Sequence, residues 1–161
     1  MLRTIRTFAF IAVLTGLVMA VALVVARHGY GFGRNGVRRL DDIAGSVSFM
    51  PLAAIYFFAV AAVMLLPLRA AAVAIAGGVD AVHGAVVVLF GAIVGCLLAK
   101  VAFGQTSALR ELEDWQYIFV AAIVGCHLLL DTMHRSVLVR SLSFVASLAA
   151  SCASLFWTFR F

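Results

Sequence analysis

Acidic and imidazole side chains recur at helical spacing in two stretches of the sequence. Asp80 and His83 are three residues apart, and His127, Asp131 and His134 follow one another at intervals of four and three. Residues three or four apart lie on one face of a helix, so each stretch predicts a polar face. Carboxylates and imidazoles together can bind a transition metal or pass protons from one group to the next. These five residues are therefore the candidates for a metal or proton site.

The same residues also have a purely structural interpretation. Ionisable groups deep inside a membrane are costly and usually functional, whereas groups near the end of a membrane helix reach water. Asp131 can pair with Arg135, four residues later on the same helix. In an antiparallel pair of helices, the start of the Asp80 stretch and the end of the Asp131 stretch would meet at one side of the membrane. The sequence leaves both interpretations open.

His83 and His127 also meet the minimum requirement for holding a haem b between two helices. Histidine is a common axial ligand of haem iron, and each of these residues lies on a different predicted helix. His83 lies near one end of its helix, whereas His127 lies further inside its own, so the two need not be level. Haem b is therefore an alternative hypothesis, and no other cofactor is indicated.

Lys100 closes the long uncharged run from Gly84 to Ala99. Its default interpretation is a lysine that extends its ammonium group to the membrane surface. If it faces the other helices instead, Glu113 or Asp114 across the following hairpin is its expected partner. The sequence shows no nucleophile beside a base and no phosphate loop, so it predicts no independent enzyme activity.

The composition places the elements that carry these residues in lipid. Of the 161 residues 65% are hydrophobic and 12% are charged, and the mean hydropathy is +1.15. Soluble domains are about 45–50% apolar and about 25% charged. The length allows four or five crossings of about 20 residues each. We therefore predict an all-α, polytopic bundle that forms a single membrane domain over residues 1–161.

Five apolar segments are long enough to be the membrane spans. Between the second and the third, Ala70–Gly78 is weakly apolar and ends in two glycines. This segment is either a re-entrant piece or an extension of the third span, and four spans are the alternative to five. The predicted spans are residues 7–26, 46–66, 80–103, 117–133 and 138–159.

The polar connection after the first span, Arg27–Gly45, is predicted to be a flexible loop at the level of the lipid headgroups. It contains a GxGxxG pattern. That pattern indicates a dinucleotide site only when it follows a strand within a βαβ unit, and here an apolar helix precedes it. Asp41 and Asp42 are expected to begin the second span as its cap and first-turn acids.

The net charge of +5 does not indicate a nucleic-acid partner. The basic residues occur mostly at predicted helix ends, where they contact lipid headgroups or set orientation. With five spans, more of them lie opposite the N-terminus, which predicts an external N-terminus and an internal C-terminus. The cysteines lie in separate apolar runs and are interpreted as buried small residues, not as a disulfide or redox centre; they are Cys96, Cys126 and Cys152.

Small residues line one face of the third and of the fifth predicted span. Glycines recur at intervals of seven and four on the third, and serines at intervals of four on the fifth. Small residues let helix backbones approach closely where lipid removes the hydrophobic driving force. The predicted helix-packing residues are Gly84, Gly91, Gly95, Ser143, Ser147 and Ser151.

The third span also resembles part of a known family. Gly84–Phe90, continuing to Val94 and Leu97-Leu98, is similar to the third helix of the J-type membrane subunit of NADH:quinone oxidoreductase, respiratory complex I. Val82 stands where that family usually has a tyrosine. The resemblance implies five spans, an external N-terminus and a third helix that can carry a π-bulge. It also implies that rotation of this segment links quinone chemistry to a proton path.

Together with this resemblance, the observations predict a non-catalytic membrane subunit of a larger, energy-transducing complex. The resemblance implies that the complex is respiratory and lies in a bacterial or mitochondrial inner membrane. The subunit's partners would be other membrane subunits and lipid, and its roles helix packing and coupling of protons to quinone chemistry. The alternative is a small transporter, channel or proton- or metal-handling protein, with Asp80, His83, His127 and Asp131 lining the path. A haem b anchor is a further alternative. So is a tetraspan-type membrane organiser in which Ala70–Gly78 joins one long third helix.

Overall fold

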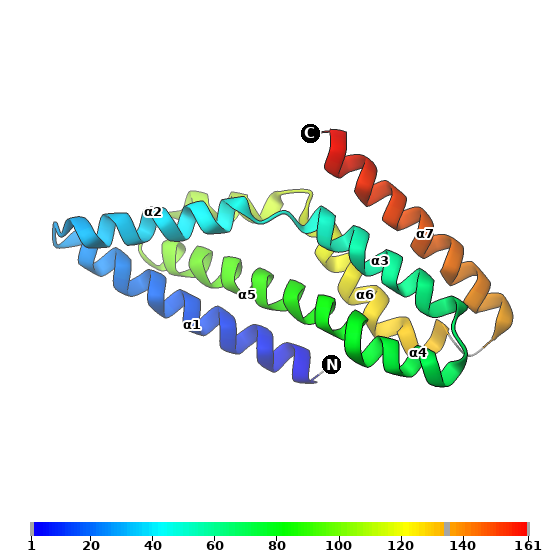
Figure 1. Ribbon diagram of the computed structural model, residues 1–161. Helices are drawn as coiled ribbons and strands as arrows, with labels where there is room; N and C mark the ends of the chain where they lie inside the picture. Colours follow the sequence, from blue (N-terminus) through cyan, green and yellow to red (C-terminus); the bar gives the residue numbers. More distant parts are fainter. Residues whose placement is uncertain (1, 134–135, 161) are drawn as a thin grey trace. The chain divides into compact units, whose positions relative to one another are not determined.

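The computed structural model describes residues 2–133 and 136–160, with the backbone alone at Arg160, and every regular element in these ranges is a helix (Figure 1). The all-α prediction is therefore confirmed. The elements are α1 (Leu2–Arg27), α2 (Gly31–Ser46), α3 (Phe49–Leu65), α4 (Leu68–Ala74), the π-helical turn η1 (Ile75–Val79), α5 (Asp80–Ala102), the 3₁₀ helix η2 (Thr106–Glu113), α6 (Tyr117–Met133) and α7 (Val137–Arg160).

Several of these helices are long and apolar enough to cross a membrane. Three meet this criterion alone, namely α1, the continuous helix Leu68–Ala102 and the α7 segment Val137–Phe159. Two bent pairs, α2 with α3 and η2 with α6, meet it together, so the described chain has three to five candidate spans. In α1 and in α7, only 17% of the most apolar stretch is buried, which suits helices surrounded by lipid. The chain is an integral membrane protein of several apolar helices.

The connection Arg27–Gly45, predicted to be a flexible loop, is largely the helix α2, so that prediction was wrong. Asp41 and Asp42 accordingly lie inside α2 and do not begin the next span, because α3 starts only at Phe49. Glycines disfavour a helix in isolation, but most helical stability in proteins comes from packing of one face. Gly33 is the buried residue of α2, and a Cβ placed on it would overlap the backbone of α1.

The ambiguous segment Ala70–Gly78 extends the third span. It belongs to one continuous helix, Leu68–Ala102, that includes the π-helical turn Ile75–Val79. Its two glycines lie inside that turn, so they widen the helix locally and do not end it. The segment Gly84–Phe90 is α-helical throughout, which places the π-helical turn before the segment to which the family resemblance points.

Two glycines in the left-handed region turn the chain at the ends of α1 and α5. Gly29 has φ +87° and Gly104 has φ +89°. The N–H groups of Gly104 and Gln105 donate to the carbonyls of Val101 and Lys100, which satisfies the last turn of α5. After Gly29, the chain runs back as α2 against α1 (Figure 1).

The described chain divides into two compact units. Unit 1 comprises residues 1–47 and 87–115, and unit 2 comprises residues 48–86 and 116–161. In unit 1, a buried cluster forms between α1 and the second half of α5, with α2 residues packed against it. In unit 2, α3 and α7 lie side by side, and Tyr56 and Phe49 of α3 are among the largest fully buried side chains. The core of unit 1 contains Met19, Leu23, Cys96 and Ala99.

Candidate functional site: an aspartate, histidine and tyrosine cluster

Unit 2 brings predicted polar residues from two helices together with a tyrosine from a third. Asp80 comes from the start of α5, His127 from α6 and Tyr56 from the middle of α3. Asp80 Oδ1 lies 3.5 Å from His127 Nε2. Tyr56 Oη lies 3.3 Å from His127 Nδ1. The imidazole of His127 therefore faces a polar partner through each of its two ring nitrogens.

His83 completes the cluster by stacking on His127. The two ring centroids are 3.8 Å apart and the ring planes differ by 4°. His83 is buried and lies one helical turn beyond Asp80 on α5. The stack restrains the plane of the His127 ring, which keeps its nitrogens directed at their partners. Two positive charges at this separation would repel, so protonating both rings at once is electrostatically unfavourable.

Exposure changes steadily along the cluster. The Asp80 side chain is 51% exposed and that of His127 is 21% exposed, whereas Tyr56 is fully buried. The cluster thus leads from an accessible carboxylate to the interior of unit 2. Because an imidazole can accept a proton at one nitrogen and release one from the other, this order of groups suits proton transfer.

The π-helical turn Ile75–Val79 immediately precedes Asp80. A π-helical turn contains more residues than an α-helical turn, so it changes the direction in which the following side chains point. Such turns occur frequently at functional sites. The directions of Asp80 and His83 from the helix therefore depend on this turn, which their sequence spacing alone does not reveal.

Of the other two candidates of the predicted metal or proton site, Asp131 lies one helical turn beyond His127 on α6, where its charge acts on the His127 imidazole. Asp131 is exposed on α6, and its expected partner Arg135 lies outside the described residues. His134 lies outside them as well. Within residues 2–133 and 136–160, no three or more His, Cys, Asp or Glu side chains are arranged to hold a metal ion.

The stacked imidazoles do not suit a haem. Ligation by both histidines would require one ring on each face of the porphyrin. A separation of 3.8 Å between the ring centroids of His83 and His127 leaves no space for a porphyrin between them. The residues present therefore do not fit haem b in this arrangement, and no chemistry of the cluster depends on it.

Tyr56 is a member of the cluster that the spacing of acids and histidines does not reveal. It is the tyrosine in the middle of a predicted span, whereas Tyr30 lies in the polar connection after the first span and Tyr117 begins the fourth. A buried tyrosine hydroxyl usually finds a hydrogen-bond partner. That signal indicates a polar contact inside the membrane, but only the packing of α3 against α6 shows that His127 supplies it.

Lys100 forms an ion-pair group within unit 1. Its Nζ lies 2.7 Å from Asp41 Oδ1 and 3.6 Å from Glu111 Oε1. The sequence pointed instead to Glu113 or Asp114 as partners. Asp41 replaces them because α2, expected to be a loop, is a helix that carries this carboxylate toward α5.

The glycines predicted for helix packing differ in their surroundings. A Cβ placed on Gly91 would lie 3.1 Å from the carbonyl oxygen of Phe8, and one on Gly95 would overlap that of Ala12. Both glycines therefore allow α1 to approach α5 closely. A Cβ on Gly84 would meet no atom within 4 Å, so Gly84 makes no comparable contact in the described structure.

The serines of α7 face α3 in unit 2. Ser147 and Ser151 are buried, and Ser143 is half-buried. The Ser151 hydroxyl donates to the carbonyl oxygen of Ala54 across the helix pair, at 3.0 Å. Ser154, one turn further on, is fully buried and donates within its own helix. The serine stripe thus lies in the α3–α7 interface.

No family model matches the chain, and the comparisons with curated proteins and with solved structures give no match either. The likeness of Gly84–Phe90 to the J-type subunit accordingly stays a hypothesis.

Proposed function

We propose that this protein is a membrane subunit that works with partner chains in an energy-transducing complex, where Asp80, His127 and Tyr56 exchange protons. One observation carries the proposal: His127 faces Asp80 through Nε2 and Tyr56 through Nδ1. A proton that reaches Asp80 can pass to Nε2, while Nδ1 releases a proton to the Tyr56 oxygen and the Tyr56 hydroxyl passes its own proton to an acceptor on a partner chain. Ionisable groups held inside a membrane protein commonly mark such relays.

Two features support dependence on partners. Three side chains in contact cover only a fraction of the roughly 30 Å thickness of the hydrocarbon core, so a complete path needs further groups. The described parts of α1 and α7 also expose many large apolar side chains, which can contact lipid or other membrane subunits. The respiratory nature of the complex rests on the resemblance of Gly84–Phe90 alone.

The partner hypothesis is tested by isolating the tagged full chain from its native membrane. Gentle solubilisation followed by native mass spectrometry should recover it with other membrane subunits at fixed stoichiometry, and redox subunits among them would support the respiratory assignment. Recovery of the chain alone, from membranes in which a known complex survives the same detergent, would contradict the proposal.

The proton role is tested in membrane vesicles that contain the assembled complex. His127→Gln should lower proton transport per substrate oxidised by about tenfold or more, because positioned proton-transfer groups contribute about 10²–10⁴-fold. Tyr56→Phe should give a smaller loss. His28→Gln is the matched control, since His28 is exposed and bonds to the carbonyl of Val24. Normal transport by an assembled His127→Gln complex would argue against the relay.

The transporter or channel hypothesis shares this cluster but needs no partner. Purified full chain in liposomes under a pH gradient distinguishes the two. A subunit should leave the gradient intact, whereas a channel or transporter should dissipate it, and His127→Gln should abolish that flux. Flux by the isolated wild-type chain would therefore replace the subunit proposal with the alternative.

A further inference from the structure

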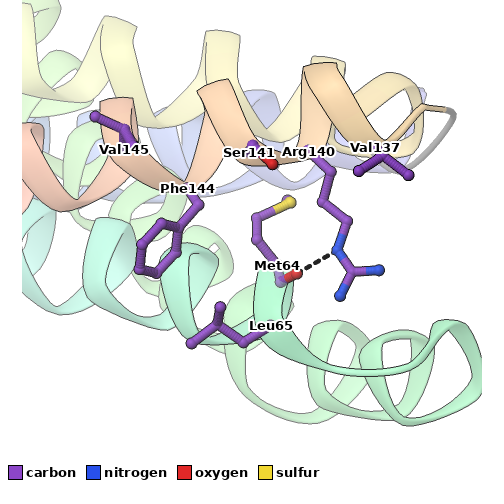
Figure 2. A pocket seen from close by; sticks show the side chains of 7 residues that line it. All are labelled: Met64, Leu65, Val137, Arg140, Ser141, Phe144 and Val145. Atoms are coloured by element: carbon purple, nitrogen blue, oxygen red, sulfur yellow. Dashed lines mark hydrogen bonds between the residues drawn. The ribbon is translucent and has the colours of Figure 1, made fainter.

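A cavity at one end of unit 2 combines an arginine with an apolar wall. It has a volume of about 440 Å³ and lies between the C-terminal end of α3 and the first turns of α7. Figure 2 shows the side chains around it. They include Met64 and Leu65 from α3, and Arg140, Ser141, Phe144 and Val145 from α7.

Arg140 is held in place by the end of α3. Its Nε donates to the carbonyl of Met64, the bond drawn in Figure 2, and its Nη2 donates to the carbonyl of Leu66 at 3.1 Å. Met64 lies in the last turn of α3, where carbonyls have no partner within the helix, and Leu66 follows directly after the helix, so Arg140 satisfies two carbonyls at this end. A guanidinium carries five N–H donors. Two are engaged with residues that the structure describes, which leaves donors for another acceptor.

The remaining lining suits an apolar chain. Phe144 and Val145 follow Arg140 along α7, and Leu65 lies opposite on α3. Leu65 is 66% exposed and Val145 is 62% exposed, so this wall opens to the surroundings of the bundle. Ser141 adds a hydroxyl to the lining of the same cavity. A ligand with an acidic head and an apolar tail would match both parts of the cavity.

The position of the cavity along the helices identifies the class of amphiphile. α3 ends at Leu65 and α7 begins at Val137, so the cavity lies where candidate spans end. Phospholipid headgroups occupy this level of a membrane, and basic pockets between membrane helices bind acidic ones. The N-terminal end of α7 adds the positive end of a helix dipole beside the arginine.

We propose that this cavity binds one anionic phospholipid. The phosphate accepts hydrogen bonds from Arg140 and Ser141, and an acyl chain lies along Phe144, Val145 and Leu65. The bound lipid contacts both α3 and α7 and so bridges the helix pair at this end. This site is independent of the proton-exchange cluster and of the partner subunits.

The test is native mass spectrometry of the purified full chain in detergent with equal amounts of phosphatidylglycerol and phosphatidylcholine of identical acyl chains. The wild-type chain should retain phosphatidylglycerol about tenfold more than phosphatidylcholine, equivalent to about 1.4 kcal/mol. Arg140→Gln should bring the ratio close to one. Arg34→Gln removes the same charge from an exposed position on α2 in unit 1 and should keep the wild-type ratio.

A second variant keeps the test decisive if Arg140→Gln fails to fold after α3 loses its two donors. Val145→Trp fills the apolar wall and leaves the bonds of Arg140 in place, and it should lower phosphatidylglycerol retention about tenfold. Millimolar inorganic phosphate should not displace the lipid. Equal retention of the two lipids by wild type, unchanged retention by Val145→Trp, or displacement by free phosphate would each overturn the proposal.

Discussion

Gly95 and Gly84 lie on the same continuous helix, yet the structure gives them different roles. Gly95 touches the backbone of α1, where the carbonyl of Ala12 occupies the space of a Cβ. Gly84 has open space there. Glycine inside a helix costs about 1 kcal/mol relative to alanine. At Gly95 the close contact of two backbones offsets this cost, whereas the described contacts of Gly84 show no such compensation.

The pair predicts opposite effects of the same substitution. Gly95→Ala should destabilise the protein by about 1–3 kcal/mol, because overpacking forces α1 away. Gly84→Ala should leave stability unchanged or raise it by up to about 1 kcal/mol through helix propensity. Thermal unfolding of the full chain in one detergent measures both. Equal shifts of Tm in the two variants would contradict the assigned contacts.

For the polar cluster, residue types and spacing predicted the candidate residues but not the contacts between them. Their spacing placed Asp80 with His83 on one helix and His127 on another, and it identified all three as candidates. Their mutual contacts, and the inclusion of Tyr56, required the packing of α3, α5 and α6 within unit 2. Spacing describes one helix at a time, so it does not determine which faces of different helices meet.

At the scale of elements, α2 joins unit 1 through a buried cation. The Lys100 side chain is 11% exposed and pairs with Asp41 of α2, which is 38% exposed. A second ion pair on the same helix, Arg38 with Asp42, has both side chains well exposed and a separation of 4.0 Å. Exposed pairs contribute about 0–1 kcal/mol, whereas breaking a buried pair costs considerably more.

The two ion pairs of α2 provide a matched comparison. Lys100→Met should destabilise unit 1 by about 1–3 kcal/mol, less than a fully buried pair would because Asp41 retains contact with solvent. It should also speed proteolysis within Gly31–Ser46. Arg38→Gln should change neither quantity measurably. Limited proteolysis and denaturant unfolding test this, and equal sensitivity of both variants would show that Lys100 does not anchor α2.

The α3–α7 pair depends on small polar residues instead. Ser151→Ala removes one hydrogen bond to the Ala54 carbonyl and should cost about 0.5–1.5 kcal/mol. Ser151→Leu should cost more, because the larger side chain separates the helices. Cys152→Leu, at the exposed neighbouring position, is the control and should be nearly neutral. Unfolding midpoints that rank the variants differently would contradict this interface.

For the whole molecule, the number of crossings depends on the two bent helix pairs. If α2 and α3 together cross the membrane, residues before and after them lie on opposite sides. If they do not cross, both ends lie on the same side. Five crossings agree with the five apolar segments of the sequence. Three crossings would result if only the helices that are singly long and apolar enough span the membrane.

Labelling with an impermeant maleimide distinguishes these arrangements. Tyr30→Cys and Leu68→Cys, two similarly exposed positions, are introduced separately into a full chain whose native cysteines are replaced by alanine. We expect five crossings, so the two cysteines should react from opposite faces of sealed vesicles. Reaction of both from one face would show that α2 and α3 do not form a span.

The sequence by itself determined that this protein lies in lipid and that its secondary structure is helical. A hydrophobic content of 65% and long uncharged runs leave helices in lipid as the stable outcome, because backbone groups there must bond within their own segment. Local rules therefore sufficed for the positions of most apolar helices and for the polar faces around Asp80 and His127.

Only the tertiary structure decided the features that depend on packing between helices. It made α2 a helix, because one of its faces packs on α1 and stabilises a segment that glycines would otherwise leave irregular. It also brought Tyr56 to His127, Asp41 to Lys100 and Arg140 to the end of α3. Each of these contacts joins residues far apart in the chain, and their pairing depends on which helix faces pack together.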